Sequence, residues 1–154
     1  MSLFSLADRV AVITGSSRGI GRAIAERMAE AGAHVVVSSR KRDACEAVVA
    51  GVEAAHGPGR AIAIPANISS KDELRNLVDE TTRRFGRIDV LVCNAASNPY
   101  YGPMAGLDDA AFRKILENNV LSNHWLIQFA ATVKSPTGPG MSAKNGTPRQ
   151  LSCT

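Results

Sequence analysis

A group of glycines directly after a short apolar segment is the part of this chain best suited to bind an anion. Residues 10–13 are apolar, and Gly15, Gly19 and Gly21 follow. Such glycines let the backbone approach phosphate groups, and the next helix directs free N–H groups and its positive dipole end at them. The spacing Gly-x-x-x-Gly-x-Gly leaves further turn residues beside the phosphates: Ser16, Ser17, Arg18 and Ile20. We predict a dinucleotide-binding turn; the alternative is an ordinary strand-to-helix turn.

The residues after the second apolar run favour one form of dinucleotide. About 20 residues beyond the glycines, an acidic side chain would hold the ribose 2′-hydroxyl of NAD. Ser39, Arg40 and Lys41 stand there instead. A hydroxyl and a guanidinium can bind a 2′-phosphate through charge-assisted hydrogen bonds, whereas an acid would repel it. We therefore expect NADP(H) to be favoured over NAD(H). Alternatively, the two cations only face solvent at a helix start, although Arg18 adds a further cation nearby.

Short polar and small residues follow the third and fourth apolar runs. Asn67 could hydrogen-bond the adenine amino group while Ile68 packs on the ring. Asn94 could tie neighbouring strands together, and the small Ala95 and Ala96 would let a cofactor approach the backbone. The alternative for each asparagine is a turn in which the side chain bonds its own backbone.

The elements that must position these residues alternate between strands and helices. Apolar runs predict strands at 10–14, 35–39, 61–66 and 88–94. Helical patterns follow at 20–31, 44–56, from 71 onward, and from near 108 toward 125. This order is typical of a parallel α/β sheet covered by helices on both faces. Val35, Val36 and Val37 are apolar without alternation and predict a central strand, and Ser70 with Glu73 predicts a capping box.

Composition and charge exclude several classes of function. The chain has 154 residues, enough for one domain, and 18 Lys plus Arg against 14 Asp plus Glu. The excess of positive charge is scattered, which does not favour nucleic-acid binding. The three cysteines and three histidines show no metal-binding spacing. No apolar run approaches the ~20 residues of a membrane span, and no signal peptide is evident. We expect a cytoplasmic protein without a metal.

The composition changes near residue 132. Residues 132–154 are rich in Pro, Gly, Ser and Thr and contain no acid and no hydrophobic period. Too few apolar residues are present to offset the entropy of ordering. We therefore divide the chain into a dinucleotide-binding domain, residues 1–131, and a disordered tail, residues 132–154.

Four motifs together resemble the short-chain dehydrogenase/reductase family. They are the glycine turn, Asn67-Ile68, Asn94-Ala95-Ala96 and Asn118-Asn119-Val120. The resemblance runs from about residue 6 to 127 and implies the N-terminal half of a Rossmann-type doubly wound parallel sheet, with about four strands and their flanking helices. Residues 97–103, after the fourth strand, resemble the NADP-dependent carbonyl and retinal reductases of this family.

The resemblance carries over only part of a catalytic site. In this family a tyrosine transfers the proton, a lysine four residues on lowers its pKa, a serine orients the carbonyl, and an asparagine supports the proton relay. Only the asparagine has a counterpart here, Asn119. The sequence contains no Tyr-x-x-x-Lys, because Met104 and Ala105 follow Tyr100 and Tyr101 at that spacing. Since general acid–base catalysis contributes about 10²–10⁴-fold, we expect no useful turnover by this chain alone.

Three interpretations remain open at this stage. The first is an NADP(H)-dependent oxidoreductase polypeptide that retains its cofactor-binding half. The second is a non-catalytic short form that binds a full-length relative through the helix of Phe112 and Trp125, since this helix contacts another subunit in complete relatives. The third is an unstable frameshift fragment with an exposed Trp125.

Overall fold

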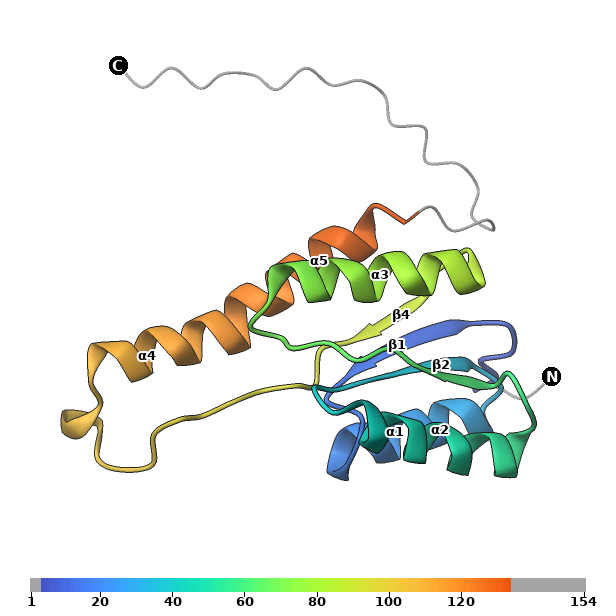
Figure 1. Cartoon of the computed structure of the whole chain (residues 1–154), viewed down its shortest axis with the longest axis horizontal. Coiled ribbons are helices and arrows are strands. Elements are labelled where there is room, and N and C mark those ends of the chain that lie inside the picture. Colours follow the sequence, from blue (N-terminus) through green and yellow to red (C-terminus); the bar gives the residue numbers. More distant parts are fainter. Residues whose placement is uncertain (1–3, 134–154) are drawn as a thin grey trace, which may run out of the picture.

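The computed structural model describes residues 4–133, which form a four-stranded parallel sheet between helices (Figure 1). The strands are β1 (Val10–Thr14), β2 (His34–Ser38), β3 (Ala61–Ala63) and β4 (Val90–Val92). Their order in the sheet is β3-β2-β1-β4, and every neighbouring pair is parallel. The predicted Rossmann-type sheet is therefore confirmed, with β2 internal as expected.

Helices cover both faces of this sheet. Helices α1 (Gly19–Glu30) and α2 (Arg42–His56) lie on one face (Figure 1). Helices α3 (Lys71–Phe85) and α5 (Ser122–Ala131) lie on the other. A 3₁₀ turn, η1 (Met104–Gly106), precedes α4 (Asp109–Leu116), which projects past the end of the sheet. A π-helical turn, η2 (Glu117–Leu121), joins α4 to α5.

Strands β1 and β2 contribute side chains to two separate hydrophobic cores. Because side chains alternate across a strand, Ile13 and Val37 pack under α1 and α2 while Val12 and Val36 pack under α3 and α5. All four are fully buried. Burial on both faces explains why these runs are apolar without alternation.

The two outer strands are shorter than predicted. Strand β3 ends at Ala63, and beyond it the N–H groups of Ile64 and Ala66, on either side of Pro65, still donate to the Val37 and Ser39 carbonyls, both at 3.1 Å. Strand β4 ends at Val92, where the chain turns: the backbone N–H of Asn94 donates back to the Val92 carbonyl at 3.0 Å and to the Thr14 hydroxyl at 3.1 Å. Among the described residues, β4 forms one edge of the sheet.

The helix starts follow the predicted caps, with two differences. Ser70 Oγ accepts from the N–H of Glu73, but the Glu73 carboxylate accepts from the N–H of Asn67 rather than closing the capping box on Ser70. Asp108 caps α4 by accepting from the N–H of Ala111. The single helix expected from near 108 toward 125 is instead divided by the π-helical turn, which inserts one extra residue.

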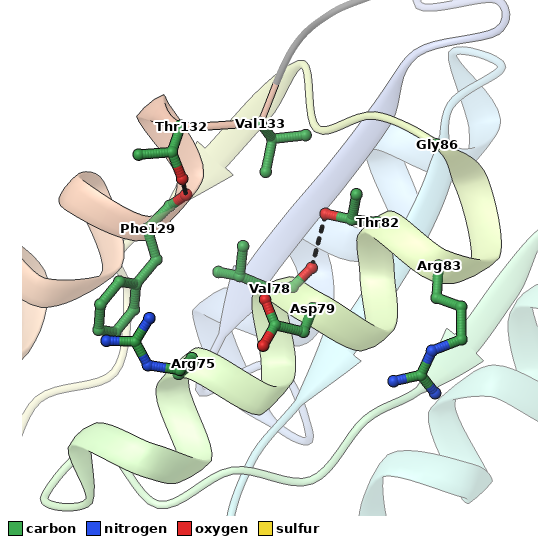
Figure 2. Close-up of a pocket in the computed structure, with 9 residues that line it drawn as sticks. All are labelled: Arg75, Val78, Asp79, Thr82, Arg83, Gly86, Phe129, Thr132 and Val133. Carbon is green, nitrogen blue, oxygen red and sulfur yellow. Dashed lines mark hydrogen bonds between the residues drawn. The ribbon is translucent and has the colours of Figure 1, made fainter.

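Helix α5 lies against α3 through aromatic side chains. The Arg75 guanidinium stacks over the Phe129 ring at 4.3 Å, and Lys71 Nζ lies 5.5 Å from the Trp125 ring. Arg75 and Phe129 border a hollow of about 530 Å³, whose lining side chains are drawn in Figure 2. Trp125 is partly buried in the core under α3. The exposed Trp125 expected of an unstable fragment is therefore not observed.

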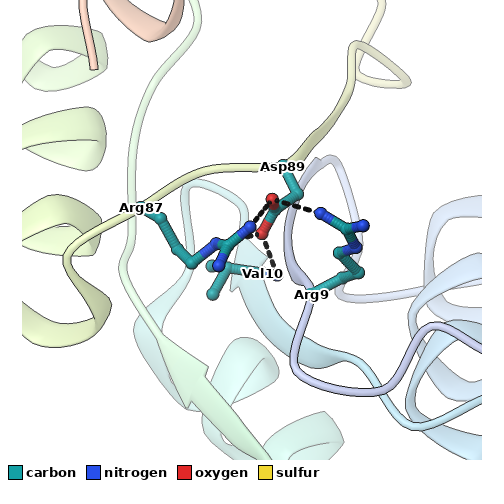
Figure 3. A network of polar contacts seen from close by, with 4 residues as sticks. All are labelled: Arg9, Val10, Arg87 and Asp89. Carbon is teal, nitrogen blue, oxygen red and sulfur yellow. Dashed lines mark hydrogen bonds and ion pairs between the residues drawn. The ribbon is translucent and has the colours of Figure 1, made fainter. Parts of the chain in front are cut away.

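An ion-pair cluster joins the starts of β1 and β4 (Figure 3). The Asp89 carboxylate accepts from the N–H of Val10 at 2.9 Å, from Arg9 at 3.2 Å and from Arg87 Nε at 2.8 Å. Its side chain is only 7% exposed. Burial acts to raise the pKa of Asp89, but the hydrogen bonds from Arg87, Val10 and Arg9 outweigh it and hold this pKa below its usual value. The cluster fixes the edge strand to its neighbour.

Two sequence predictions concern the whole chain, of which the structure describes residues 4–133. Of the predicted disordered tail, residues 134–154 lie outside the described part, so the division into residues 1–131 and 132–154 stays a prediction. Within residues 4–133, no helix is long and apolar enough to cross a bilayer.

Candidate functional site

A groove of about 850 Å³ opens at the carboxyl ends of the strands, where the strand-to-helix loops meet. In doubly wound sheets this edge is the usual ligand site. The glycine turn, the loop after β2, the loop after β3 and the loop after β4 all contribute residues to it. The smaller hollow in Figure 2 lies between two helices, away from these loops. The groove is therefore the candidate site.

The glycine turn gives this groove a wall of bare backbone. Gly15 and Gly19 have positive φ, +67° and +56°, which disfavours other residues. A Cβ at Gly21 would lie 2.4 Å from the Gly15 carbonyl oxygen, so only glycine fits there. A Cβ at Gly19 would meet nothing within 4 Å, because this position faces open space. The glycine turn is therefore closely packed at Gly21 and open at Gly19, where phosphates would lie.

The first turn of α1 has backbone donors available to an anion. Its N-cap, Arg18, makes no side-chain capping hydrogen bond, and the first turn contains no acidic residue. N–H groups at a helix start need an acceptor, and the helix dipole favours a negative one. This geometry fits the phosphate groups of a dinucleotide.

Three cations line the groove without a carboxylate beside them. Arg18, Arg40 and Lys41 border it, and no Asp or Glu occurs among its described lining residues. Within residues 4–133, none of the three forms a salt bridge. The Ser39 hydroxyl lies beside them, 3.2 Å from the buried thiol of Cys45. The electrostatics of this end favour an anionic group.

Ser16 does not face the groove, and the expectation that it lies beside the phosphates is wrong. Its side chain is fully buried. Its hydroxyl donates to the Ile13 carbonyl at 2.7 Å and accepts from the N–H of Ser38 at 2.9 Å. Ser16 therefore links the glycine turn to the end of β2, while Ser17 and Arg18 border the groove.

Asn67 and Ile68 line the groove in the loop after β3. Asn67 Oδ1 accepts from the N–H of Ser69 at 3.1 Å, so the side chain forms the turn that the sequence left open as an alternative. A carbonyl oxygen has two lone pairs, and the second could still accept from an adenine amino group. Ile68 packs partly against the core below.

Asn94 joins the loops after β1 and β4. Its Nδ2 donates to the carbonyls of Thr14, at 3.0 Å, and Gly15, at 3.3 Å. The Thr14 hydroxyl in turn accepts from the N–H groups of Asn94 and Ala95, both at 3.1 Å. These bonds hold the loop after β4 close to the glycine turn. The short side chains of Ala95 and Ala96 line the groove there and leave space above them.

Two adjacent asparagines of the π-helical turn hold Ser97 at the far end of the groove. Asn119 accepts from the N–H of Ser97 and donates to its carbonyl, both at 2.9 Å. Asn118 donates to the Ser97 hydroxyl at 2.6 Å and accepts from the Ser69 hydroxyl at 2.7 Å. Asn119, carried over as the catalytic asparagine, is thus engaged with the loop backbone, and it is not among the lining residues.

The fold brings together all thirteen residues predicted to bind the cofactor. Every one lines the groove: Gly15, Ser17, Arg18, Gly19, Ile20, Gly21, Ser39, Arg40, Asn67, Ile68, Asn94, Ala95 and Ala96. Their roles in binding stay predictions. The lining also contains residues that were not predicted as site residues: Lys41, Ala44, Ala66, Ser69, Ser97 and Asn118. Lys41, Ser97 and Asn118 belong to segments that the sequence analysis singled out, whereas Ala66 and Ser69 are marked only by being next to a predicted residue.

Sheet order and groove together define a Rossmann-type α/β domain, and comparison with known proteins identifies its family. A family model described as short chain dehydrogenase matches residues 9–138. The chain belongs to the short-chain dehydrogenase/reductase family, whose members bind nicotinamide dinucleotides.

Individual relatives agree with this assignment. The chain is 40% identical over 127 residues to the short-chain dehydrogenase/reductase SDRA of Arabidopsis thaliana, covering 80% of this chain and 48% of that protein. It is 42% identical over 118 residues to human dehydrogenase/reductase SDR family member 2, mitochondrial, covering 76% and 41%. The chain spans about half the length of the curated relatives it matches.

Solved structures show the same fold. A hydroxysteroid dehydrogenase from Escherichia coli has a TM-score of 0.73 at 38% identity, over 84% of this chain and 50% of that one. A metagenomic short-chain oxidoreductase in complex with NADP has a TM-score of 0.75 at 32% identity, over 82% and 56%.

Proposed function

We propose that this chain binds NADP(H) in the groove and is the cofactor-binding half of a short-chain oxidoreductase. In the complete family the reaction is carbonyl reduction or alcohol oxidation, and the loop of residues 97–103 favours the carbonyl and retinal reductase subgroup. A bound NADPH would supply the hydride. The residues of this chain would bind the phosphates, the ribose and the adenine.

The cation cluster at the end of β2 is the observation that carries this proposal. Arg18, Arg40 and Lys41 border the groove without a neighbouring carboxylate in its described lining. The free 2′-hydroxyl of the NAD ribose is typically bound by an acidic side chain. Such a side chain would repel the 2′-phosphate of NADP. Guanidinium groups bind phosphate through paired hydrogen bonds. The charges therefore support NADP(H) over NAD(H).

The pair of residues that transfers the substrate proton in this family has no counterpart in the sequence. The sequence has no Tyr-x-x-x-Lys, and the Asn119 amide is occupied by the Ser97 backbone. We therefore propose dinucleotide binding without turnover by this chain alone. NADPH oxidation dependent on a carbonyl substrate should not exceed that of a blank.

A titration with each dinucleotide tests the proposal. Trp125, the single tryptophan, is partly buried between α5 and α3, so its fluorescence should report unfolding. We expect one cooperative transition whose midpoint rises with NADPH concentration, because a ligand that binds only the folded state stabilises it. NADH should raise it less at the same concentration. A midpoint that neither dinucleotide moves would contradict the proposal.

A second candidate function is supported by one exposed helix face. The apolar side chains of Phe112, Leu116 and Val120 are 48%, 44% and 60% exposed and follow one another at helical spacing. Exposed apolar stripes of this kind are typical of protein contacts. A non-catalytic short form that binds a full-length relative would use this face. Coexpression with such a relative should then yield stable mixed oligomers, which the first proposal does not require.

A further inference from the structure

We propose that Asn118 is a positioning residue for dinucleotide binding, because it bridges two loops that line the groove, the loop after β3 and the loop after β4. This inference rests on the proposed function. Its one amide contacts Ser69, in the loop after β3, and Ser97, in the loop after β4, at 2.7 and 2.6 Å. In the described part of the chain no direct hydrogen bond joins these two loops.

The amide at the centre of the bridge is buried and hydrogen-bonded at both its oxygen and its nitrogen. Asn118 is 5% exposed, and no buried side-chain nitrogen or oxygen within residues 4–133 lacks a partner. The backbone carbonyl oxygen of Asn118 accepts from the Ser122 hydroxyl, and this bond anchors the π-helical turn to α5. A satisfied buried amide fixes its neighbours in one arrangement, since any other would leave polar groups unpaired.

The two bridged loops carry the residues that would contact opposite parts of the ligand. Ser69 directly follows the Asn67-Ile68 pair proposed for the adenine. Ser97 directly follows Ala95 and Ala96, which also line the groove. A bridge between them sets the distance between the two loops before the ligand arrives. When the competent arrangement is only partly populated, the apparent affinity falls by that fraction.

Asn118→Leu removes the bridge while keeping a side chain of similar size. Ser69 is exposed and Ser97 is partly exposed, so both hydroxyls can bond water and the variant should fold. We expect the dissociation constants of NADPH and NADH to rise together by about tenfold, with their ratio unchanged. The matched control is Asn123→Leu, because Asn123 lies in the same helical region and its amide bonds only the Asn119 carbonyl. The control should bind within about twofold of wild type.

A double-mutant cycle separates positioning from direct contact with the ligand. Ser69→Ala breaks one arm of the same bridge, so adding it to Asn118→Leu should cause no further loss. Hydrogen exchange in the free protein provides a readout that needs no ligand. Amides of residues 67–70 and 95–98 should exchange faster in Asn118→Leu than in wild type or Asn123→Leu, while β1 and β2 stay protected.

The outcomes distinguish this inference from the proposed function. If wild type binds neither dinucleotide, the proposed function fails, and the binding role of Asn118 fails with it. If wild type binds and Asn118→Leu binds equally well, only the inference is overturned. It is also overturned if affinity is lost with unchanged exchange and no coupling to Ser69, because Asn118 would then act by touching the ligand.

Discussion

Two arginine-containing clusters lie at opposite ends of β1 and differ in one respect. At its start, Arg9 and Arg87 share the carboxylate of Asp89 (Figure 3). Beyond its end, Arg18 and Arg40 border the groove and form no salt bridge within the described residues. The same residue type is neutralised at one end and left uncompensated at the other.

The difference separates structural charges from binding charges. A charge that is paired inside the chain contributes to folding and has little left to offer a ligand. Uncompensated cations around a concave surface raise the local positive potential and attract an anionic ligand. We therefore expect substitutions at the start of β1 to change stability, and those beyond its end to change affinity.

The largest effect is expected at Gly21, where the chain backbone leaves no space. A Cβ there would lie 2.4 Å from the Gly15 carbonyl oxygen and 2.5 Å from Asn94 Nδ2. We expect Gly21→Ala to lower the free energy of unfolding by about 3 kcal/mol, as overpacking does, and to abolish dinucleotide binding. Chemical denaturation followed by Trp125 fluorescence measures this.

Gly51 provides the matched control for this substitution. It lies inside α2, and a Cβ would meet nothing within 4 Å. Gly51→Ala should raise the free energy of unfolding by about 0.5–1 kcal/mol, because alanine is the better helix former. Equal stabilities of the two variants would contradict the close packing of the glycine turn.

The next effect is on the selectivity of binding. Arg40→Asp should weaken NADPH binding by about 10- to 100-fold, since a charge-assisted hydrogen bond is replaced by repulsion. NADH binding should be nearly unchanged, and isothermal titration of both dinucleotides measures the ratio. Arg42→Asp is the control: Arg42 pairs with Glu46 and is not among the groove's lining residues. Equal losses for NADPH and NADH in Arg40→Asp would refute the 2′-phosphate role.

A smaller effect on stability, with none on binding, is expected at Asp89. Asp89→Asn removes the charge that three donors share and should cost about 1–3 kcal/mol of unfolding free energy. Because the pKa of Asp89 is held below its usual value, its contribution is present above about pH 4, the unfolded pKa, and is lost as pH falls through the folded pKa. The variant should therefore lose less stability on acidification than wild type.

The Asp89 and Arg40 variants together test the comparison between the two clusters. Thermal unfolding between about pH 5 and pH 2 gives the acid dependence, and titration well below the melting temperature gives the affinity. Asp89→Asn should keep the affinity and selectivity of wild type, and Arg40→Asp should keep its melting temperature without ligand. The opposite pattern in either variant would show that the two clusters do not have separate roles.

Most of the fold could be predicted because its signals are local. The strand Val10–Thr14 was predicted with its observed bounds, the cap at Ser70 was predicted, and α4 begins at Asp109, close to the helix start expected near residue 108. The π-helical turn at Glu117–Leu121 and the early end of β4 could not be predicted. Where β4 ends, the N–H of Asn94 donates to Thr14, 80 positions away in the chain.

The sequence predicted which residues form the candidate site but not the hydrogen bonds between them. The glycine spacing and the polar residues after each strand indicated thirteen residues that the fold does gather in one groove. The local sequence pattern does not separate Ser16, which is buried, from Ser17, which lines the groove. Serine at either position satisfies the same local pattern, so only the packing of β2 beside the turn distinguishes them.

The sequence by itself determined the family, the order of strands and helices along the chain, and the residue types at each loop, because these depend on neighbouring residues and on spacing. Tertiary structure alone decided which loops meet. The Ser69 hydroxyl and the Asn118 amide are 49 positions apart and bond only because parallel strands bring their carboxyl ends to one edge. Within residues 4–133, the same folding gives Arg40 no salt bridge and pairs Arg87 with Asp89.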